Sequence, residues 1–148
     1  ESGKPIGNDN GQVRFLVDGF NRIPFGECKD SHLQEAIENI ERHFHVIGPT
    51  DCFNAVMIML HYKECWKTYP FYYRHNVSKQ RKSREELNVK DHEIIMKYNY
   101  LDKKLYDYVS MRFKYDCQQI KEFDAILQSF NSYNRYYQAI AKYIPILR

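Results

Sequence analysis

The segment LQEAIENIERHFHVIGPTDCFNAVMIMLHYKECW, residues Leu33–Trp66, decides the fold that the sequence predicts. Its first part follows Ser31, a good N-cap residue, and repeats apolar residues every three or four positions, which indicates an amphipathic helix. FHVIG (Phe44–Gly48) is short and β-branched, so we predict a buried strand that stops at a Gly-Pro pair. Thr50 or Asp51 then caps a second helix. Helix, strand and capped helix in this order predict an α/β fold.

The remaining elements extend this pattern in both directions. Residues 1–12 are polar and rich in Gly and Asn, so we expect a flexible lead-in. QVRFLVDGF (Gln12–Phe20) is predicted to form a short strand. A strongly helical stretch begins at Asp91, and a final helix carries Phe123 and ends at a proline. No internal repeat is visible, so residues 13–148 are predicted to form a single domain.

Composition and charge place the chain among folded domains. With 148 residues, of which 43% are hydrophobic and 28% charged, it is long enough for one core and too apolar for disorder. The net charge of +3 does not by itself imply a polyanionic partner. No apolar run approaches the roughly 18 residues of a membrane span. The first residues, ESGKPIGNDNG, include neither an initiating Met nor a signal peptide, so we expect a processed or truncated chain.

A basic segment, YYRHNVSKQRKSREELN (Tyr72–Asn88), is the most unusual stretch of the chain. Acidic residues follow it directly, so its positive charge is local and favours a discrete sulfate or phosphate group over a long stretch of DNA. A solvated connector explains the same composition. Tyr72 and Tyr73 could stack on bases, but no RNA- or DNA-binding motif is present, so no nucleic-acid partner is predicted. The basic residues are Arg74, Lys79, Arg81, Lys82 and Arg84.

Cysteine and histidine spacing indicates neither a metal site nor a nucleophile. The four cysteines show no CxxC pattern, and those other than Cys65 have no visible activating partner. His43 and His45 share one side of the predicted strand but lack a third ligand, which favours a structural role. Two disulfides are compatible with a secreted chain, but the spacing does not choose a pairing. Asn76, in the triplet NVS, fits the glycosylation sequon.

Several of these pieces together resemble one family. Leu33–Trp66 is similar to the carboxy-terminal half of the Golgi carbohydrate sulfotransferases, in which a helix leads to a vG-x-T-E turn and a Leu-rich helix. YNYLDKKLYDYVSMRF (Tyr98–Phe113) resembles the later helix of that family, which carries an LY pair. The heparan sulfate and uronyl 2-O-sulfotransferases are the most similar, followed by the galactose 3-O-sulfotransferases. The resemblance runs from about Gln12 to Phe113 and rests on the order and spacing of these motifs.

This resemblance implies a fold, a reaction and a location. The fold would be the P-loop-type sulfotransferase fold, here helix-rich with a few parallel strands. The reaction transfers a sulfonate from 3′-phosphoadenosine 5′-phosphosulfate (PAPS) to a sugar hydroxyl without a metal. The implied location is the Golgi lumen, or outside the cell after secretion, and the sequon at Asn76 agrees with it.

The resemblance also implies binding residues. Arg81 is the best positional match to the arginine with which the 2-O-sulfotransferases contact the acidic sugar chain, and Lys79 and Lys82 lie beside it. We expect these residues to bind an anionic carbohydrate or the 3′-phosphate of the nucleotide. Arg74 and Arg84 are weaker candidates on the same segment. Thr50 and Asp51 are expected to be structural caps first and ligand contacts second.

The chain also departs from the family. The phosphosulfate loop, the catalytic base and the 3′-phosphate site belong to an amino-terminal half that has no match here, so no catalytic residue is predicted. Thr50-Asp51 replaces the Thr-Glu of the family, and Val17 replaces a cysteine, which leaves Cys28 without its expected partner.

These departures leave more than one function open. We expect the carboxy-terminal part of a PAPS-dependent carbohydrate sulfotransferase, either as a fragment of a longer precursor or as a subunit completed by another chain. The alternative is a non-catalytic, sulfotransferase-derived binding or structural subunit. A third option is a helical interaction subunit that uses the tyrosine-rich faces around Tyr133, Tyr136 and Tyr137.

Overall fold

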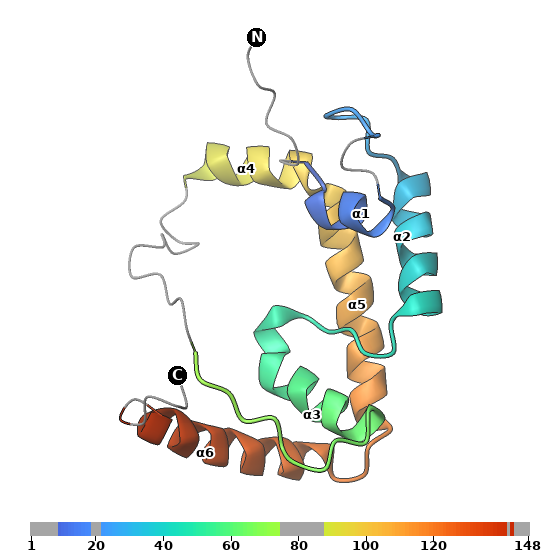
Figure 1. The fold of residues 1–148 in the computed structure, drawn as a ribbon. Coiled ribbons are helices and arrows are strands. Elements are labelled where there is room, and N and C mark those ends of the chain that lie inside the picture. Colours follow the sequence, from blue (N-terminus) through green and yellow to red (C-terminus); the bar gives the residue numbers. More distant parts are fainter. Residues whose placement is uncertain (1–8, 19–21, 75–87, 142, 144–148) are drawn as a thin grey trace. The chain divides into compact units, whose positions relative to one another are not determined.

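The computed structural model describes residues 9–18, 22–74, 88–141 and 143, and helices are the only regular secondary structure within these ranges (Figure 1). The predicted α/β fold with a few parallel strands is therefore wrong for the described part of the chain. The elements are α1 (Gly11–Leu16), α2 (Asp30–His43), the short 3-10 helix η1 (Thr50–Cys52), α3 (Phe53–Lys63), α4 (Val89–Tyr98), α5 (Tyr100–Gln118) and α6 (Phe123–Ala141).

Both predicted strands are corrected by the structure. Within Gln12–Phe20, the described residues up to Leu16 belong to α1, because a carboxylate from a distant helix accepts hydrogen bonds from its first backbone N–H groups. Phe44–Gly48 has no strand partner among the described residues. A β-branched composition alone does not make a strand, since its backbone groups need a neighbouring strand to pair with.

The helix predictions are confirmed with shifted ends. Helix α2 buries one face as its periodicity predicts, but Lys29 rather than Ser31 is its N-cap. The second helix is preceded by η1 and ends at Lys63. The helical stretch expected from Asp91 is divided at Asn99 into α4 and α5.

The described residues belong to two compact units. Unit 1 comprises Glu1–His45 and Lys82–Ser110, and unit 2 comprises Val46–Arg81 and Met111–Arg148. Helix α5 therefore contributes its first half to unit 1 and its second half to unit 2.

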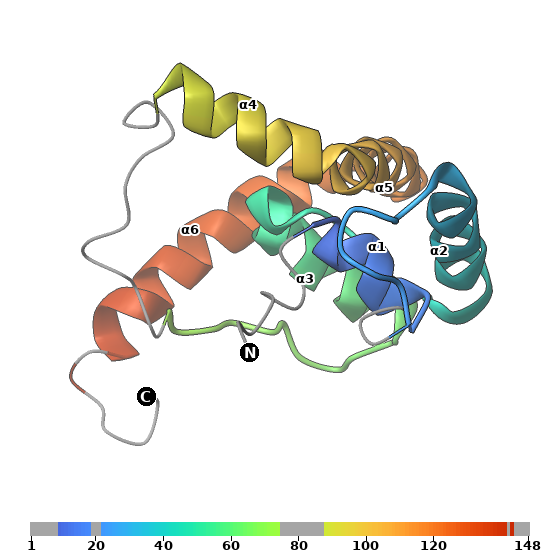
Figure 2. The same cartoon turned by 90° about the horizontal axis from the view of Figure 1, so that it is seen from above.

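In unit 1, two helix starts are capped by each other's residues. The side chain of Asn10, just before α1, accepts a hydrogen bond of 2.9 Å from the backbone N–H of Leu101 in α5. In return, the carboxylate of Asp102 accepts from the N–H groups of Gln12 at 3.1 Å and Val13 at 2.9 Å. These bonds satisfy donors that a helix start leaves unpaired. They fix α1 beside α5, and α1 also packs against α2 (Figure 2).

A buried ion pair holds the loop that follows α1. The Arg14 guanidinium lies 2.9 Å from the Asp9 carboxylate, and both side chains are almost fully buried. Arg14 also donates to the Asp9 carbonyl at 2.8 Å, to the Pro24 carbonyl at 2.7 Å and to the Ile23 carbonyl. Asp9 and Asn10 belong to the predicted flexible lead-in, yet in the structure they are buried at 1% and 3% exposure.

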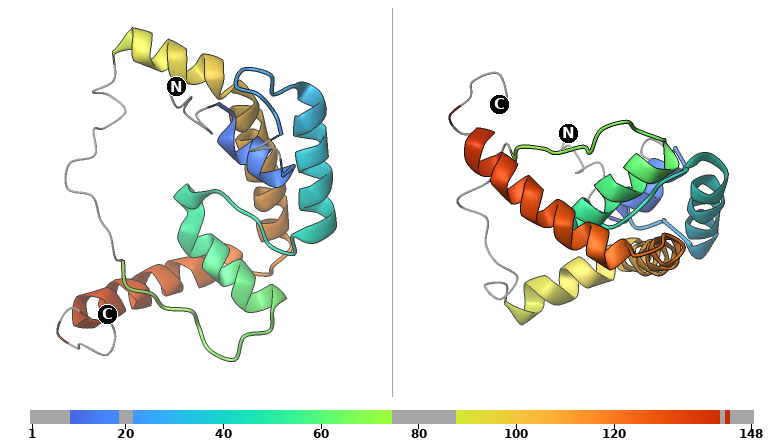
Figure 3. Two further views of the ribbon diagram at one scale, coloured as in Figure 1. Left: turned by 45° about the horizontal axis from the view of Figure 1, so that its top comes forward. Right: turned by 90° about the horizontal axis from the view of Figure 1, so that it is seen from below.

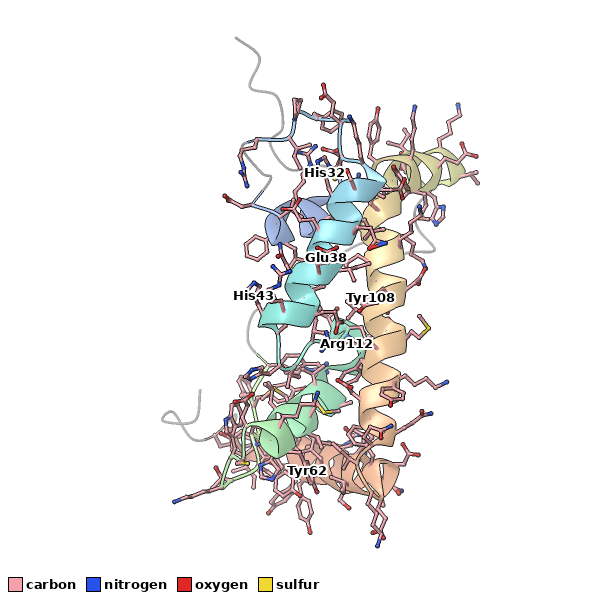
Figure 4. The ribbon with its side chains drawn as sticks, turned by 90° about the vertical axis from the view of Figure 1, so that its right-hand side faces the viewer. His32, Glu38, His43, Tyr62, Tyr108 and Arg112 are labelled. Carbon is pink, nitrogen blue, oxygen red and sulfur yellow. The ribbon has the colours of Figure 1, made fainter. Side chains whose placement is uncertain are left out.

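The longer helices of unit 1 are joined by polar contacts at their surface. Lys104 of α5 lies 2.7 Å from Asp30 at the start of α2, and the Tyr108 hydroxyl donates to Glu41. Figure 4 shows α2 beside the first half of α5, with Tyr108 on the side of α5 that faces α2. The apolar core of this unit consists of Val13, Val17, Cys28, Leu33, Ala36, Ile40, Leu101, Leu105 and Val109.

In unit 2, the end of α5 packs with α3 and α6. Gly48 lies so close to these helices that a Cβ atom there would be 2.6 Å from the Val56 side chain and 2.9 Å from the Phe113 ring. After α3, the chain runs along α6 as far as Arg74 (Figure 3). The core consists of Ala55, Ile58, Met59, Phe113, Phe123 and Phe130.

Candidate functional site

The predicted binding residues are only partly described. Asn76, the sequon residue, and four of the basic residues lie outside the described ranges, namely Lys79, Arg81, Lys82 and Arg84. Arg74 is described and exposed. It lines a pocket of unit 2 together with Thr50 and Asp51, the helix-start residues that the sequence suggested as secondary ligand contacts.

The pocket lies at the start of α3 and has a volume of about 320 Å³. Three parts of unit 2 contribute to it: η1 with the first turn of α3, the segment after α3, and the middle of α6. Its lining combines charged and amide side chains with the apolar side chains of Phe53 and Leu127. We call it the Arg74 pocket, and it is lined by Thr50, Asp51, Cys52, Phe53, Asn54, Ala55, Arg74, Leu127 and Asn131.

Consecutive hydrogen bonds connect the side chains that form one wall of the Arg74 pocket. The Tyr72 hydroxyl donates to Asn54 Oδ1, and Asn54 Nδ2 donates in turn to Asn131 Oδ1. The backbone N–H of Tyr72 donates to Asn134 Oδ1 at 3.0 Å, and its ring meets Phe53 edge-on with centroids 4.9 Å apart. Because its oxygen accepts from Asn54, Asn131 has its NH₂ group left for the pocket.

The chemistry of the pocket suits a polar ligand with an anionic group. Arg74 supplies a guanidinium fork and Asn131 a neutral donor, while Asp51 is an acceptor for a hydroxyl group. The Phe53 ring, 42% exposed, adds an apolar face. Sugars combine hydroxyl groups with apolar C–H faces, so an acidic sugar matches all of these groups.

Unit 2 also carries an aromatic groove of about 460 Å³ between α6 and the segment after α3. Phe71 stacks on Phe130 with ring centroids 5.4 Å apart, and Tyr133 leaves 66% of its surface exposed beside them. Among the described residues that line the groove, most are aromatic or aliphatic and none carries a charge. It is lined by Tyr69, Phe71, Ala125, Ile126, Ser129, Phe130 and Tyr133.

The thiols of Cys117 and Cys28 are less acidic than an ordinary cysteine. Burial, followed by the negative charge of Asp116, raises the pKa of the Cys117 thiol to about 11, so the thiol stays protonated at neutral pH. Burial likewise raises the pKa of Cys28. In the ranges that the structure describes, no three His, Cys, Asp or Glu side chains gather in a way that could hold a metal ion. None of the described helices has the length and apolar character needed to cross a membrane.

Sequence reasoning missed the asparagines of the Arg74 pocket. Asn54 and Asn131 are separated by 77 positions, and neither belongs to a recognisable motif. Only the folded arrangement of α3 and α6 brings them together. Comparisons with protein families, with curated proteins and with solved structures found no match to this chain.

Proposed function

We propose that the Arg74 pocket binds an anionic sugar group, and that the chain does so as the carboxy-terminal part of a PAPS-dependent carbohydrate sulfotransferase. The binding proposal rests on one observation: Arg74, Asp51 and Asn131 line the same pocket. The sulfotransferase reaction is supported by the order of motifs between Gln12 and Phe113 alone, since the helical fold gives it no support.

Arg74 is the residue that we expect to bind the anionic group of the ligand. A guanidinium matches the oxygens of a sulfate, carboxylate or phosphate group better than a point charge does, and the amide of Asn131 adds a second donor from another direction. Two ligands share this chemistry: an acidic or sulfated sugar, and the 3′-phosphate of the nucleotide. The hydroxyl acceptor Asp51 favours the sugar.

Sulfonate transfer needs a loop that binds the phosphosulfate and a catalytic base, and no residue of this chain is assigned to either role. We propose that the phosphosulfate loop and the base that activates the acceptor hydroxyl come from an amino-terminal half or from another chain. Lys79, Arg81, Lys82 and Arg84 follow Arg74 in the sequence and are proposed to extend its positive charge toward the same ligand. The Golgi lumen, or secretion, is the location that this reaction implies.

Replacing Arg74 by Gln tests the binding proposal. Titration calorimetry with a sulfated heparin-like disaccharide is expected to show affinity about tenfold weaker for Arg74→Gln, because one charge-assisted interaction is lost. A parallel titration with 3′-phosphoadenosine 5′-phosphate distinguishes the sugar from the nucleotide. Arg135→Gln is the matched control, since Arg135 is exposed on α6 but does not line the pocket. Equal affinities in both variants and the wild type would refute the assignment.

The aromatic groove favours a second candidate function, a non-catalytic interaction subunit. Exposed tyrosine and phenylalanine rings are enriched at the centres of protein interfaces. For an interaction subunit of this kind, we expect the purified chain to self-associate, so that its mass measured by light scattering rises with protein concentration. Tyr133→Ser is expected to weaken this association, whereas Tyr115→Ser, with a similar exposure of 63%, is not. A monomeric mass at all concentrations contradicts self-association through the groove.

A further inference from the structure

The Tyr72 hydroxyl makes a contact that the packing of its own segment does not need. The segment is already held to α6 by the bond from the Tyr72 backbone N–H to Asn134, a side chain only 1% exposed. The Tyr72 ring packs edge-on against Phe53 and lies at the border of the unit 2 core. Both contacts would survive the loss of the hydroxyl oxygen. What that oxygen adds is its bond to Asn54.

This bond favours one orientation of two amides, because a phenol hydroxyl is a stronger donor than acceptor and so pairs with an amide oxygen rather than with an NH₂ group. A side-chain amide has an acceptor end and a donor end of nearly the same shape, so its partners determine its orientation. Asn54 Oδ1 accepts from Tyr72, which directs Asn54 Nδ2 toward Asn131. Asn131 must then offer its oxygen to Asn54 and leave its NH₂ group for the pocket. If Asn54 turned over, Asn131 would turn as well and leave an oxygen for the pocket.

The orientation of Asn131 matters because of the charge that Arg74 is proposed to bind. An NH₂ group in the pocket that Arg74 also lines donates to an anionic oxygen, whereas a carbonyl oxygen in its place repels it. An uncharged sugar is less sensitive, because its hydroxyl groups donate and accept equally well. The orientation of Asn131 therefore affects the choice between charged and uncharged ligands more than the overall affinity.

We infer that Tyr72 is a positioning residue, which acts through Asn54 to hold the Asn131 amide as a donor and so makes the pocket select anionic over uncharged sugars. The inference rests on the proposed function of the Arg74 pocket. It assigns Asn131 a direct contact with the anionic group and Tyr72 an indirect role. Neither residue is one of the charged residues of the basic segment, and no sequence motif includes Asn131.

The test compares Tyr72→Phe with the wild type by calorimetry, using a sulfated disaccharide, a uronate disaccharide and an uncharged disaccharide. Affinity for the two anionic probes is expected to fall about tenfold, since a donor to the anion is lost, while affinity for the uncharged probe changes little. The melting temperature is expected to stay close to that of the wild type. Asn131→Asp should weaken the anionic probes further, and Tyr133→Phe, a control outside the pocket, should change none of them.

Two results overturn the inference while leaving the proposed function intact. The first is an unchanged ratio of anionic to uncharged affinity in Tyr72→Phe, together with weaker binding in Arg74→Gln. The second needs no ligand: the side-chain NH₂ resonances of Asn54 and Asn131 in ¹⁵N spectra stay unchanged when the hydroxyl is removed. Wild-type protein that binds no anionic probe refutes the proposed function itself, whatever the resonances show.

Discussion

Replacing Arg14 by Met is expected to lower the free energy of unfolding by about 3 to 5 kcal/mol, because it leaves a buried carboxylate without its partner. The side chains of Arg14 and Asp9 are only 3% and 2% exposed. The guanidinium also binds the backbone carbonyls of Ile23 and Pro24, which lose their donors in the variant. Urea denaturation followed by circular dichroism measures the loss.

The control for this prediction is another arginine of unit 1. Arg22 pairs with Asp18 at 3.4 Å, but the side chains are 69% and 98% exposed. Exposed pairs contribute about 0 to 1 kcal/mol, so Arg22→Met should have little effect. Asp9→Leu combined with Arg14→Met should recover part of the lost stability, since no charge is then left buried. Equal losses for Arg14→Met and Arg22→Met would show that the buried pair does not hold this loop.

The sequence predicts the helices of this chain well because their apolar periodicity is local. In the helix predicted after Ser31, Leu33 and Ile40 are buried as expected, Ile37 is half-buried, and Phe44 just after the helix is 39% exposed. The predictions fail where residues far away in the sequence determine the local secondary structure. Gln12 to Leu16 has the apolar and β-branched residues of a strand, and its helix start is capped by Asp102, 90 positions away from Gln12. Nothing in the local sequence indicates that cap.

The same distinction applies to the candidate site. Arg74, Thr50 and Asp51 were accessible to sequence reasoning, because a basic segment and a helix start are recognised from neighbouring residues. Asn131 was not, because an asparagine within a helix is ordinary until α6 is placed beside α3. Arg14 is a comparable case: an isolated arginine in a short apolar stretch is expected at the surface, and only the folded loop buries it.

Replacing Phe130 by Ala is expected to lower the free energy of unfolding by about 3 to 5 kcal/mol, because a large buried ring is removed and a cavity remains. Phe130 is 1% exposed and is a core residue of unit 2. Its ring also supports the segment after α3, with centroid distances of 5.4 Å to Phe71 and 6.2 Å to Tyr69. The loss is measured by urea denaturation, as for Arg14.

The matched control for Phe130 lies on the same helix. Tyr136 of α6 is 69% exposed, so Tyr136→Ala removes a ring of similar size from the same helix without opening a cavity. It is expected to change stability by about 0.5 kcal/mol or less. Phe130→Leu should lose less than Phe130→Ala, because it fills part of the space. If Phe130→Ala and Tyr136→Ala lost the same small amount, Phe130 would not be the packing centre of unit 2, and the aromatic groove above it would lack a fixed floor.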